Sequence, residues 1–152
     1  MSFRMEADLR AGIAKVLERS PLGVLATCGP DGAHTSLVGM AFTEGLDRAM
    51  FVTTRTSRKY TDLVTTPRVS ILMDDRRNEV TDFRDASAVS VSGMAREAMG
   101  DECDLLGAIY LERHPHLKDF LAAPTTALVV VDVRRLSMVT RFQKVMEMVL
   151  DG

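Results

Sequence analysis

The residues best suited to chemistry lie between Phe51 and Pro67, in the segment FVTTRTSRKYTDLVTTP. The turn at its centre carries hydroxyl groups and positive charges, on Thr53, Thr54, Arg55, Thr56, Ser57, Arg58 and Lys59. Cations in the first turn of a helix oppose the helix dipole, at a cost of roughly 0.3–1 kcal/mol each, unless an anion lies there. Free backbone N–H groups, hydroxyls and cations at a helix N-terminus together form a phosphate site. The segment is therefore either a phosphate-binding turn or a solvated turn without a ligand.

Three histidines are the other candidates for chemistry. His34 follows a turn signal, which is typical of a side chain that faces solvent, and the alternative is a donor of a proton or a hydrogen bond to a substrate. His114 and His116 flank Pro115, where a helical pattern breaks, and neither has a Cys or carboxylate partner at metal-ligand spacing. We therefore expect a structural capping role for this pair, with a haem or metal ligand as the alternative. No Ser-His-Asp set and no pair of carboxylates at suitable spacing indicates a hydrolase.

Periodicity and turn signals predict the elements that position these residues. Apolar residues at helical spacing predict a helix over residues 4–19, which Ser20-Pro21 ends. Strands are predicted over residues 22–28, 33–43, 48–54, 69–73, 87–98 and 127–140. Helices are predicted over residues 57–66 and, as a pair, between residues 99 and 123. A charged loop is predicted over residues 74–85. The apolar residues of the tail after residue 140 fit neither helical nor strand periodicity.

Two residues within these strands need an explanation. Gly39 in a strand indicates a bulge or the close approach of another backbone or a flat ligand. Asp132 stands between Val131 and Val133 and would be costly if it were buried without a partner. We expect a neighbouring Arg134 or Arg135, or a wet strand face, to satisfy its carboxylate.

Length and composition limit the classes of function. The chain has 152 residues, a size at which one domain buries about 68–70% of its unfolded surface, so we expect a single domain over residues 1–152. A formal net charge of −2 argues against a general nucleic-acid binder. Two cysteines are too few for a disulfide framework and lack metal-ligand spacing. The charged N-terminus has no signal-peptide core and no stretch resembles a membrane span, so we expect a cytoplasmic protein.

The order of the elements predicts the fold class. Consecutive strands joined by tight turns favour an antiparallel barrel over a sheet built from βαβ units. We therefore expect a mainly β fold, in which a six-stranded antiparallel barrel carries helices at its ends.

The chain resembles the pyridoxamine 5'-phosphate oxidase-like superfamily of FMN-binding split barrels in three ordered segments: LATCGPDGAHTSLVGMAF, MFVTTRTSRKYTDLVTTPRVSILM and VSVSGMAREA. The resemblance covers about residues 20–98 well and is most specific at Ser57-Arg58-Lys59, which Thr66-Pro67 follows. It implies a split β-barrel that binds FMN noncovalently. Members of the superfamily are typically homodimers with flavin sites at the subunit interface, so residues 89–93 would complete the site of the partner.

The resemblance also implies which residues hold FMN. Arg58 and Lys59 would bind the phosphate, and Thr53, Thr54, Thr56 and Ser57 would surround it with hydroxyl groups. Thr35, Ser36, Leu37 and Val38 would lie along the isoalloxazine ring. Val52 and Thr53 would touch the flavin from the next strand.

Departures from the superfamily pattern limit the expected activity. The pyridoxamine-phosphate oxidases proper carry arginine and lysine on the second strand where this chain has Ser36 and Ala41, so oxidation of pyridoxamine phosphate is not expected. Residues 110–115 resemble an element of the branches that include haem-utilisation proteins, whereas Arg141 stands where those branches have glycine.

We therefore expect an FMN-dependent oxidoreductase for a small or planar substrate, since the redox chemistry resides in the flavin. The alternatives are a nonenzymatic FMN or haem binding protein or electron carrier, and a structural dimer whose flavin site has been lost. A deazaflavin in place of FMN also fits the residues, because both carry phosphate and a flat tricyclic ring.

Overall fold

A computed structural model describes residues 3–140 and 144–150 of the chain. Arg141, compared above with the glycine of the haem-utilisation branches, lies outside the described residues. The helices are α1 (Phe3–Arg19), α2 (Arg58–Thr65), α3 (Asp82–Asp85), α4 (Gly100–Arg113), the 3₁₀ turn η1 (Pro115–Leu117) and α5 (Lys118–Ala122). The strands are β1 (Leu22–Gly29), β2 (Gly32–Gly39), β3 (Ala41–Phe42), β4 (Arg48–Thr54), β5 (Arg68–Asp74), β6 (Ala88–Glu97), β7 (Thr126–Thr140) and β8 (Lys144–Val149).

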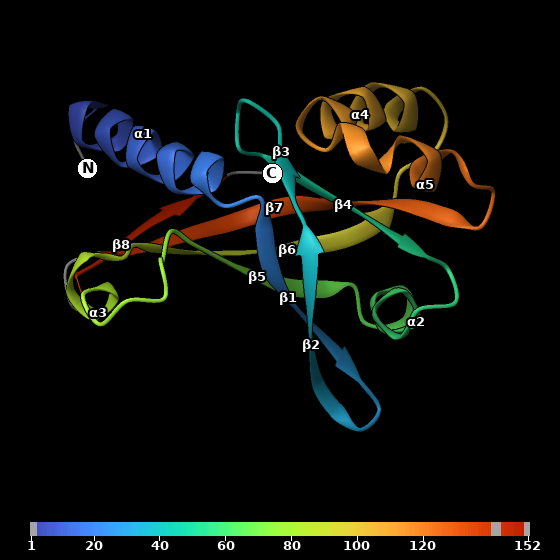
Figure 1. Ribbon diagram of the computed structural model, residues 1–152, viewed down its shortest axis with the longest axis horizontal. Helices are drawn as coiled ribbons and strands as arrows, with labels where there is room; N and C mark the ends of the chain where they lie inside the picture. Colours follow the sequence, from blue (N-terminus) through green and yellow to red (C-terminus); the bar gives the residue numbers. More distant parts are fainter. Residues whose placement is uncertain (1–2, 141–143, 151–152) are drawn as a thin grey trace.

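The strands form one antiparallel sheet in the order β2-β1-β5-β6-β7-β4-β3, and β8 pairs with the second half of β7. β2 and β3 are almost continuous in the chain but lie at opposite ends of this order, so the sheet must curl until its edges approach each other. Figure 1 shows this half-barrel with α1 and α4 on one side of the β6–β7 band and α2 and α3 on the other. The predicted fold class, a mainly β split barrel with flanking helices, is confirmed.

The strand count differs from the predicted six because the second predicted strand is interrupted and a last strand is added. Met40 leaves the ladder: its N–H donates to Pro21 O at 3.0 Å, and its carbonyl accepts from His114 Nε2 at 2.8 Å. Within the described chain β2 therefore pairs with β1 alone, β3 pairs with β4, and no strand pairing joins β2 to β4.

The remaining elements follow the predicted pattern with one correction. β6 alternates as expected, with Val89, Val91, Gly93 and Ala95 buried. The segment predicted as a charged loop contains the short helix α3, because the Asp82 carboxylate accepts backbone N–H groups from Arg77 and Glu79 and folds the loop back on itself. A local hydrogen bond of this kind competes with an open loop conformation.

Two apolar clusters stabilise the fold. The larger one fills the concave side of the sheet and includes the buried stripe Leu9, Ile13, Val16 and Leu17 of α1. The smaller one lies under α4, around Leu106 and Tyr110. Among the described residues, no helix combines the length and hydropathy needed to cross a membrane.

Candidate functional site

The turn between β4 and α2 has a defined local structure. Ser57 is the N-cap of α2, with extended backbone, and its Oγ accepts the Tyr60 N–H at 3.3 Å. Thr53 Oγ1 lies 2.7 Å from Ser57 Oγ, so the buried Thr53 holds the cap in place. Thr56 is exposed and donates to Thr54 Oγ1 at 3.3 Å. The four predicted hydroxyl residues are thus gathered at one helix N-terminus.

Arg55, one of the three cations in this turn, is committed to internal contacts. Its Nε donates to Glu97 Oε1 at 2.7 Å and its Nη1 donates to Pro124 O at 2.7 Å. Tyr60 Oη donates to the same Glu97 oxygen at 3.1 Å. The Arg55 guanidinium thereby lowers the pKa of Glu97. Arg55 fastens the turn to the end of β6 and the start of β7, and it is not free to bind a ligand.

Arg58 and Lys59 remain available for an anion. The Arg58 side chain is 62% exposed, and its nearest carboxylate is that of Asp31, which is itself exposed, at 3.8 Å. Lys59 is half-buried and makes no ion pair with any residue that the structure describes. Within the described part of the chain, the backbone N–H groups of Arg58 and Lys59 also find no acceptor. Unused N–H groups beside two uncommitted cations fit a phosphate group.

The residues predicted to contact the flavin ring lie on β2 and β4, which do not pair with each other. On β2, the edge strand, Thr35 and Leu37 are exposed, Ser36 is half-buried and Val38 is in the core. Val38 could therefore reach a ligand only through its backbone. On β4, Val52 is half-buried. The unpaired edge of β2 offers backbone donors and acceptors to a flat ligand.

A buried carboxylate that the sequence reasoning missed lies behind the two cations. Asp62 on α2 is 4% exposed and accepts hydrogen bonds from His34 Nδ1 on β2 and from Thr27 Oγ1 on β1, both at 2.8 Å. These bonds, chiefly the one from His34, lower the pKa of Asp62. The prediction that His34 faces solvent holds for only part of the side chain, which is 21% exposed, because α2 packs across the β1–β2 hairpin and presents its Asp62 carboxylate to Nδ1. The sequence signal was a carboxylate next to the buried Leu63 on the apolar face of a helix.

Asp62→Asn should reduce the loss of folding stability that occurs as the pH falls. The folded-state pKa of Asp62 is depressed below 3.8, so its stabilising effect is present above the unfolded pKa and is lost as pH falls through the folded value. Urea unfolding midpoints between pH 7 and pH 3 should therefore decline less in Asp62→Asn than in the parent chain. The matched control is Asp31→Asn at an exposed carboxylate, which should keep the parental slope. Equal slopes for all three proteins would contradict the assignment.

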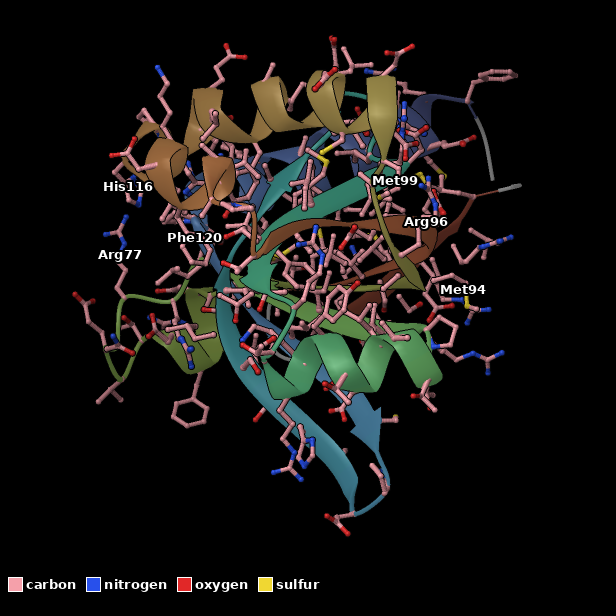
Figure 2. All side chains as sticks on the ribbon, turned by 90° about the vertical axis from the view of Figure 1, so that its right-hand side faces the viewer. Arg77, Met94, Arg96, Met99, His116 and Phe120 are labelled. Atoms are coloured by element: carbon pink, nitrogen blue, oxygen red, sulfur yellow. The ribbon has the colours of Figure 1, made fainter. Side chains whose placement is uncertain are left out.

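Tyr110 of α4 and His114, the residue that follows this helix, connect the helical hairpin to the interruption between β2 and β3. Tyr110 Oη donates to Gly39 O at 3.0 Å, and the buried His114 donates from Nε2 to Met40 O. A Cβ on Gly39 would lie 3.2 Å from Tyr110 Oη and 3.4 Å from His114 Cε1, so the close neighbours of this glycine are side chains, where the sequence indicated a backbone or a flat ligand. The expected structural role of His114 agrees with this contact, since its Nε2 is occupied. His116 is exposed at the outer end of the hairpin (Figure 2).

Tyr110→Phe should lower the free energy of unfolding by about 1–2 kcal/mol, because it leaves the half-buried Gly39 carbonyl without this donor. Burial raises the pKa of Tyr110 to about 12, so the phenol stays protonated and the effect should be constant from pH 6 to pH 9. Urea unfolding followed by circular dichroism measures it. A variant as stable as the parent chain would show that the bond contributes nothing.

The carboxylate of Asp132 finds a partner different from the expected ones. Arg96 on β6 donates from Nε to Asp132 Oδ2 at 2.8 Å, and the same guanidinium binds Glu102 at the start of α4. Of the two expected alternatives, pairing with Arg134 or Arg135 is not what the described residues show, whereas the wet strand face agrees with an Asp132 side chain that is 38% exposed. Figure 2 shows Arg96 close to Met99, where α4 begins. The network joins α4 to the sheet.

A groove of about 970 Å³ runs along the outer face of the β2-β1-β5 sheet and ends at the predicted ring contact Leu37. Its floor is apolar, formed by Leu22, Val24, Leu37 and Leu72, and Val24 pairs directly with both Leu37 and Leu72. The loop from Asp74 to Ala86 forms one wall. The groove thus combines an apolar floor with a wall rich in charged side chains.

Comparison with known sequences identifies the family. Residues 9–140 match the sequence model described as pyridoxamine 5'-phosphate oxidase. The chain belongs to this family. None of the curated proteins matches the sequence.

Solved structures with the same fold include a haem binding protein from Mycobacterium smegmatis, with 20% identity and a TM-score of 0.81 over 92% of this chain and 57% of that one. The haem storage protein HutZ from Vibrio cholerae shows 16% identity and a TM-score of 0.67 over 91% and 92% of the two chains. An FAD-binding protein from Mesorhizobium loti shows 18% identity and a TM-score of 0.66 over 84% and 91%. This chain therefore spans little more than half of the M. smegmatis protein, and at such identities the likeness establishes the fold.

Proposed function

We propose that the protein binds FMN and acts as a flavin-dependent oxidoreductase on a small or planar substrate. The observation that carries the proposal is the N-terminus of α2, where Arg58 and Lys59 are uncommitted and the first backbone N–H groups have no acceptor in the described chain. The phosphate of FMN fits this donor set, and the unpaired edge of β2 offers backbone groups to the ring. Membership of the pyridoxamine 5'-phosphate oxidase family supports the same ligand.

In this proposal each part of the chain has a separate task. Arg58 and Lys59 bind the phosphate, with Thr56 and Ser57 as further donors. Thr35 to Val38 and Val52 hold the ring, which supplies the redox chemistry when bound. No acid or base among these side chains is required for hydride or electron transfer at a flavin.

We also propose a cytoplasmic homodimer with two flavin sites at its interface. Leu22, Leu37 and Leu72 are 52%, 66% and 40% exposed on one sheet face, which is a large apolar area for a monomer. A second copy would cover part of this face and bring its residues 89–93 to the site. Light scattering after gel filtration should give twice the chain mass, and a monomer at micromolar concentration would contradict the dimer.

Titration with FMN tests the proposed ligand directly. The purified protein should quench flavin fluorescence with an equivalence point of one FMN per chain, and a reduced pyridine nucleotide should then bleach the bound flavin. Binding without any such reduction would favour a nonenzymatic carrier over the oxidoreductase. Mass measurement of a chromophore released from the purified protein distinguishes FMN from a deazaflavin.

Haem binding is the second candidate, and the names of the M. smegmatis and V. cholerae structures support it. His114 Nε2 is bonded to Met40 O, so the exposed His116 is the better axial ligand on this hairpin. A Soret band on addition of haem that His116→Ala abolishes would support this candidate. A haem spectrum that stays unchanged when the protein is added would exclude haem binding.

A further inference from the structure

Glu97, the last residue of β6, holds the turn between β4 and α2 from two sides. Its Oε1 accepts hydrogen bonds from Arg55 Nε at 2.7 Å and from Tyr60 Oη at 3.1 Å. Arg55 precedes α2, whereas Tyr60 lies in the first turn of this helix. One carboxylate therefore binds the chain both before and after Arg58 and Lys59.

The contact between Glu97 and Arg55 fixes the orientation of both side chains. Arg55 Nε donates to one carboxylate oxygen of Glu97, and Arg55 Nη2 donates to the other at 3.3 Å. A two-point contact of this kind adds geometric specificity to the attraction between the charges. Two further bonds fix Arg55, since its Nη1 donates to Pro124 O and its backbone N–H donates to Thr125 O at 3.1 Å.

Tyr60 carries the position of Glu97 to the N-cap of α2. Its hydroxyl donates to Glu97, and its backbone N–H donates to Ser57 Oγ at 3.3 Å. The Tyr60 ring packs against the larger apolar cluster, and the Glu97 side chain is only 17% exposed. The first turn of α2 is thus held by its hydroxyl contact, by its cap and by the core.

A phosphate at this helix end depends on how the first turn is held. Backbone N–H groups at a helix N-terminus bind an anion together, since they point toward it in parallel. In the part of the chain that the structure describes, the N–H groups of Arg58 and Lys59 have no acceptor. A turn that is ordered before the ligand arrives avoids the entropy cost of ordering it on binding.

The charge of Glu97 and its contacts have opposite effects on an anion at the turn. A carboxylate near the site repels phosphate, so its charge alone weakens binding. Its bonds to Arg55 and Tyr60 favour binding, because they keep the first turn of α2 in place. The sign of the change on removing Glu97 therefore shows which effect is larger.

We propose that Glu97 is a positioning residue of the phosphate site, which acts through Arg55 and Tyr60 to hold the first turn of α2 ready for a phosphate monoester. The inference rests on the proposed function. It adds to the site a residue of β6, which lies 42 positions after Arg55 in the chain and outside the Ser57-Arg58-Lys59 run.

The test compares FMN with riboflavin, which has the same ring and no phosphate. The ratio of their dissociation constants, measured by flavin fluorescence in one buffer, isolates the contribution of the phosphate. Glu97→Ala removes both contacts, Glu97→Gln keeps an acceptor oxygen without the charge, and Tyr60→Phe removes the hydroxyl contact alone. The matched control is Glu102→Ala, which removes a carboxylate with the same two-point contact to a different arginine, Arg96.

The preference for FMN over riboflavin should fall about tenfold in Glu97→Ala and about threefold in Tyr60→Phe, with Glu97→Gln between them. Riboflavin should bind these variants as it binds the parent chain. Glu102→Ala should keep at least the parental preference, because it makes the same change in net charge without a contact to Arg55 or Tyr60.

A parental preference in Glu97→Ala and Tyr60→Phe would overturn the inference and leave the proposed function intact, even if both variants unfold more easily. A raised preference in Glu97→Ala would also overturn it, because the charge of Glu97 would then outweigh its contacts. A parent chain that binds FMN no better than riboflavin would overturn the phosphate site and the inference together. If Glu97→Ala does not fold, Tyr60→Phe decides the question, since it removes a single hydroxyl group.

Discussion

Replacing both Arg58 and Lys59 with alanine should lower the affinity for FMN by about 100-fold or more. Each cation is expected to make a charge-assisted hydrogen bond to the phosphate, and such bonds contribute about 1.5–3 kcal/mol each. Both side chains lie at the surface of α2, so their removal should leave the unfolding midpoint nearly unchanged. Equilibrium titration followed by flavin fluorescence measures the effect.

Two controls separate loss of the phosphate site from loss of net charge. Lys15→Ala with Arg84→Ala removes the same number of exposed cations from α1 and α3, away from α2, and should bind FMN like the parent chain. Riboflavin should bind the Arg58→Ala, Lys59→Ala variant as it binds the parent, because it lacks the phosphate. Unchanged FMN affinity in that variant would show that the phosphate lies elsewhere.

Gly93→Ala should destabilise the fold by about 3 kcal/mol. The β6–β7 pairing shifts register between Ser92 and Gly93, and a Cβ on Gly93 would overlap the carbonyl oxygen of Asp132 on the neighbouring strand. The same Cβ would lie 2.9 Å from Asp132 C and 3.0 Å from Val131 Cγ1, so two strands would have to separate. Steric overlap with a backbone in the centre of a sheet is among the mechanisms that give large losses of stability.

Urea unfolding of Gly93→Ala beside Ser92→Ala measures this effect. Ser92 precedes the register shift, is half-buried and pairs with Arg135, so its replacement should change stability by at most about 0.5 kcal/mol. A Gly93→Ala variant as stable as Ser92→Ala would show that the register shift tolerates a side chain.

The parts of the fold that the sequence predicts well are those determined by local periodicity. Leu9, Ile13, Val16 and Leu17 recur at helical spacing and form the buried stripe of α1. The alternation along β6 is equally local. The interruption of the second strand at Met40 is different, because it depends on His114, which is 74 residues away in the chain. No pattern within the strand itself signals that contact.

The same distinction applies to the site. The Ser57-Arg58-Lys59 run indicated a helix N-terminus with cations, and Ser57 is indeed the N-cap of α2. The sequence could not show that Arg55 is bound to Glu97, 42 residues away, because that contact requires the end of β6 to lie beside the turn. Nor could it show that Asp62 meets His34, since the hairpin must first pack on α2. Long-range pairing decides which charges of a cluster remain free.

The measurement that tests the central claim most directly is the absorption spectrum of the protein as purified, with any released chromophore identified by mass. The proposal predicts the two visible and near-ultraviolet bands of oxidised flavin and a released mass equal to that of FMN. A colourless protein that also fails to take up added FMN would contradict the proposal and leave the family and the fold as the established results.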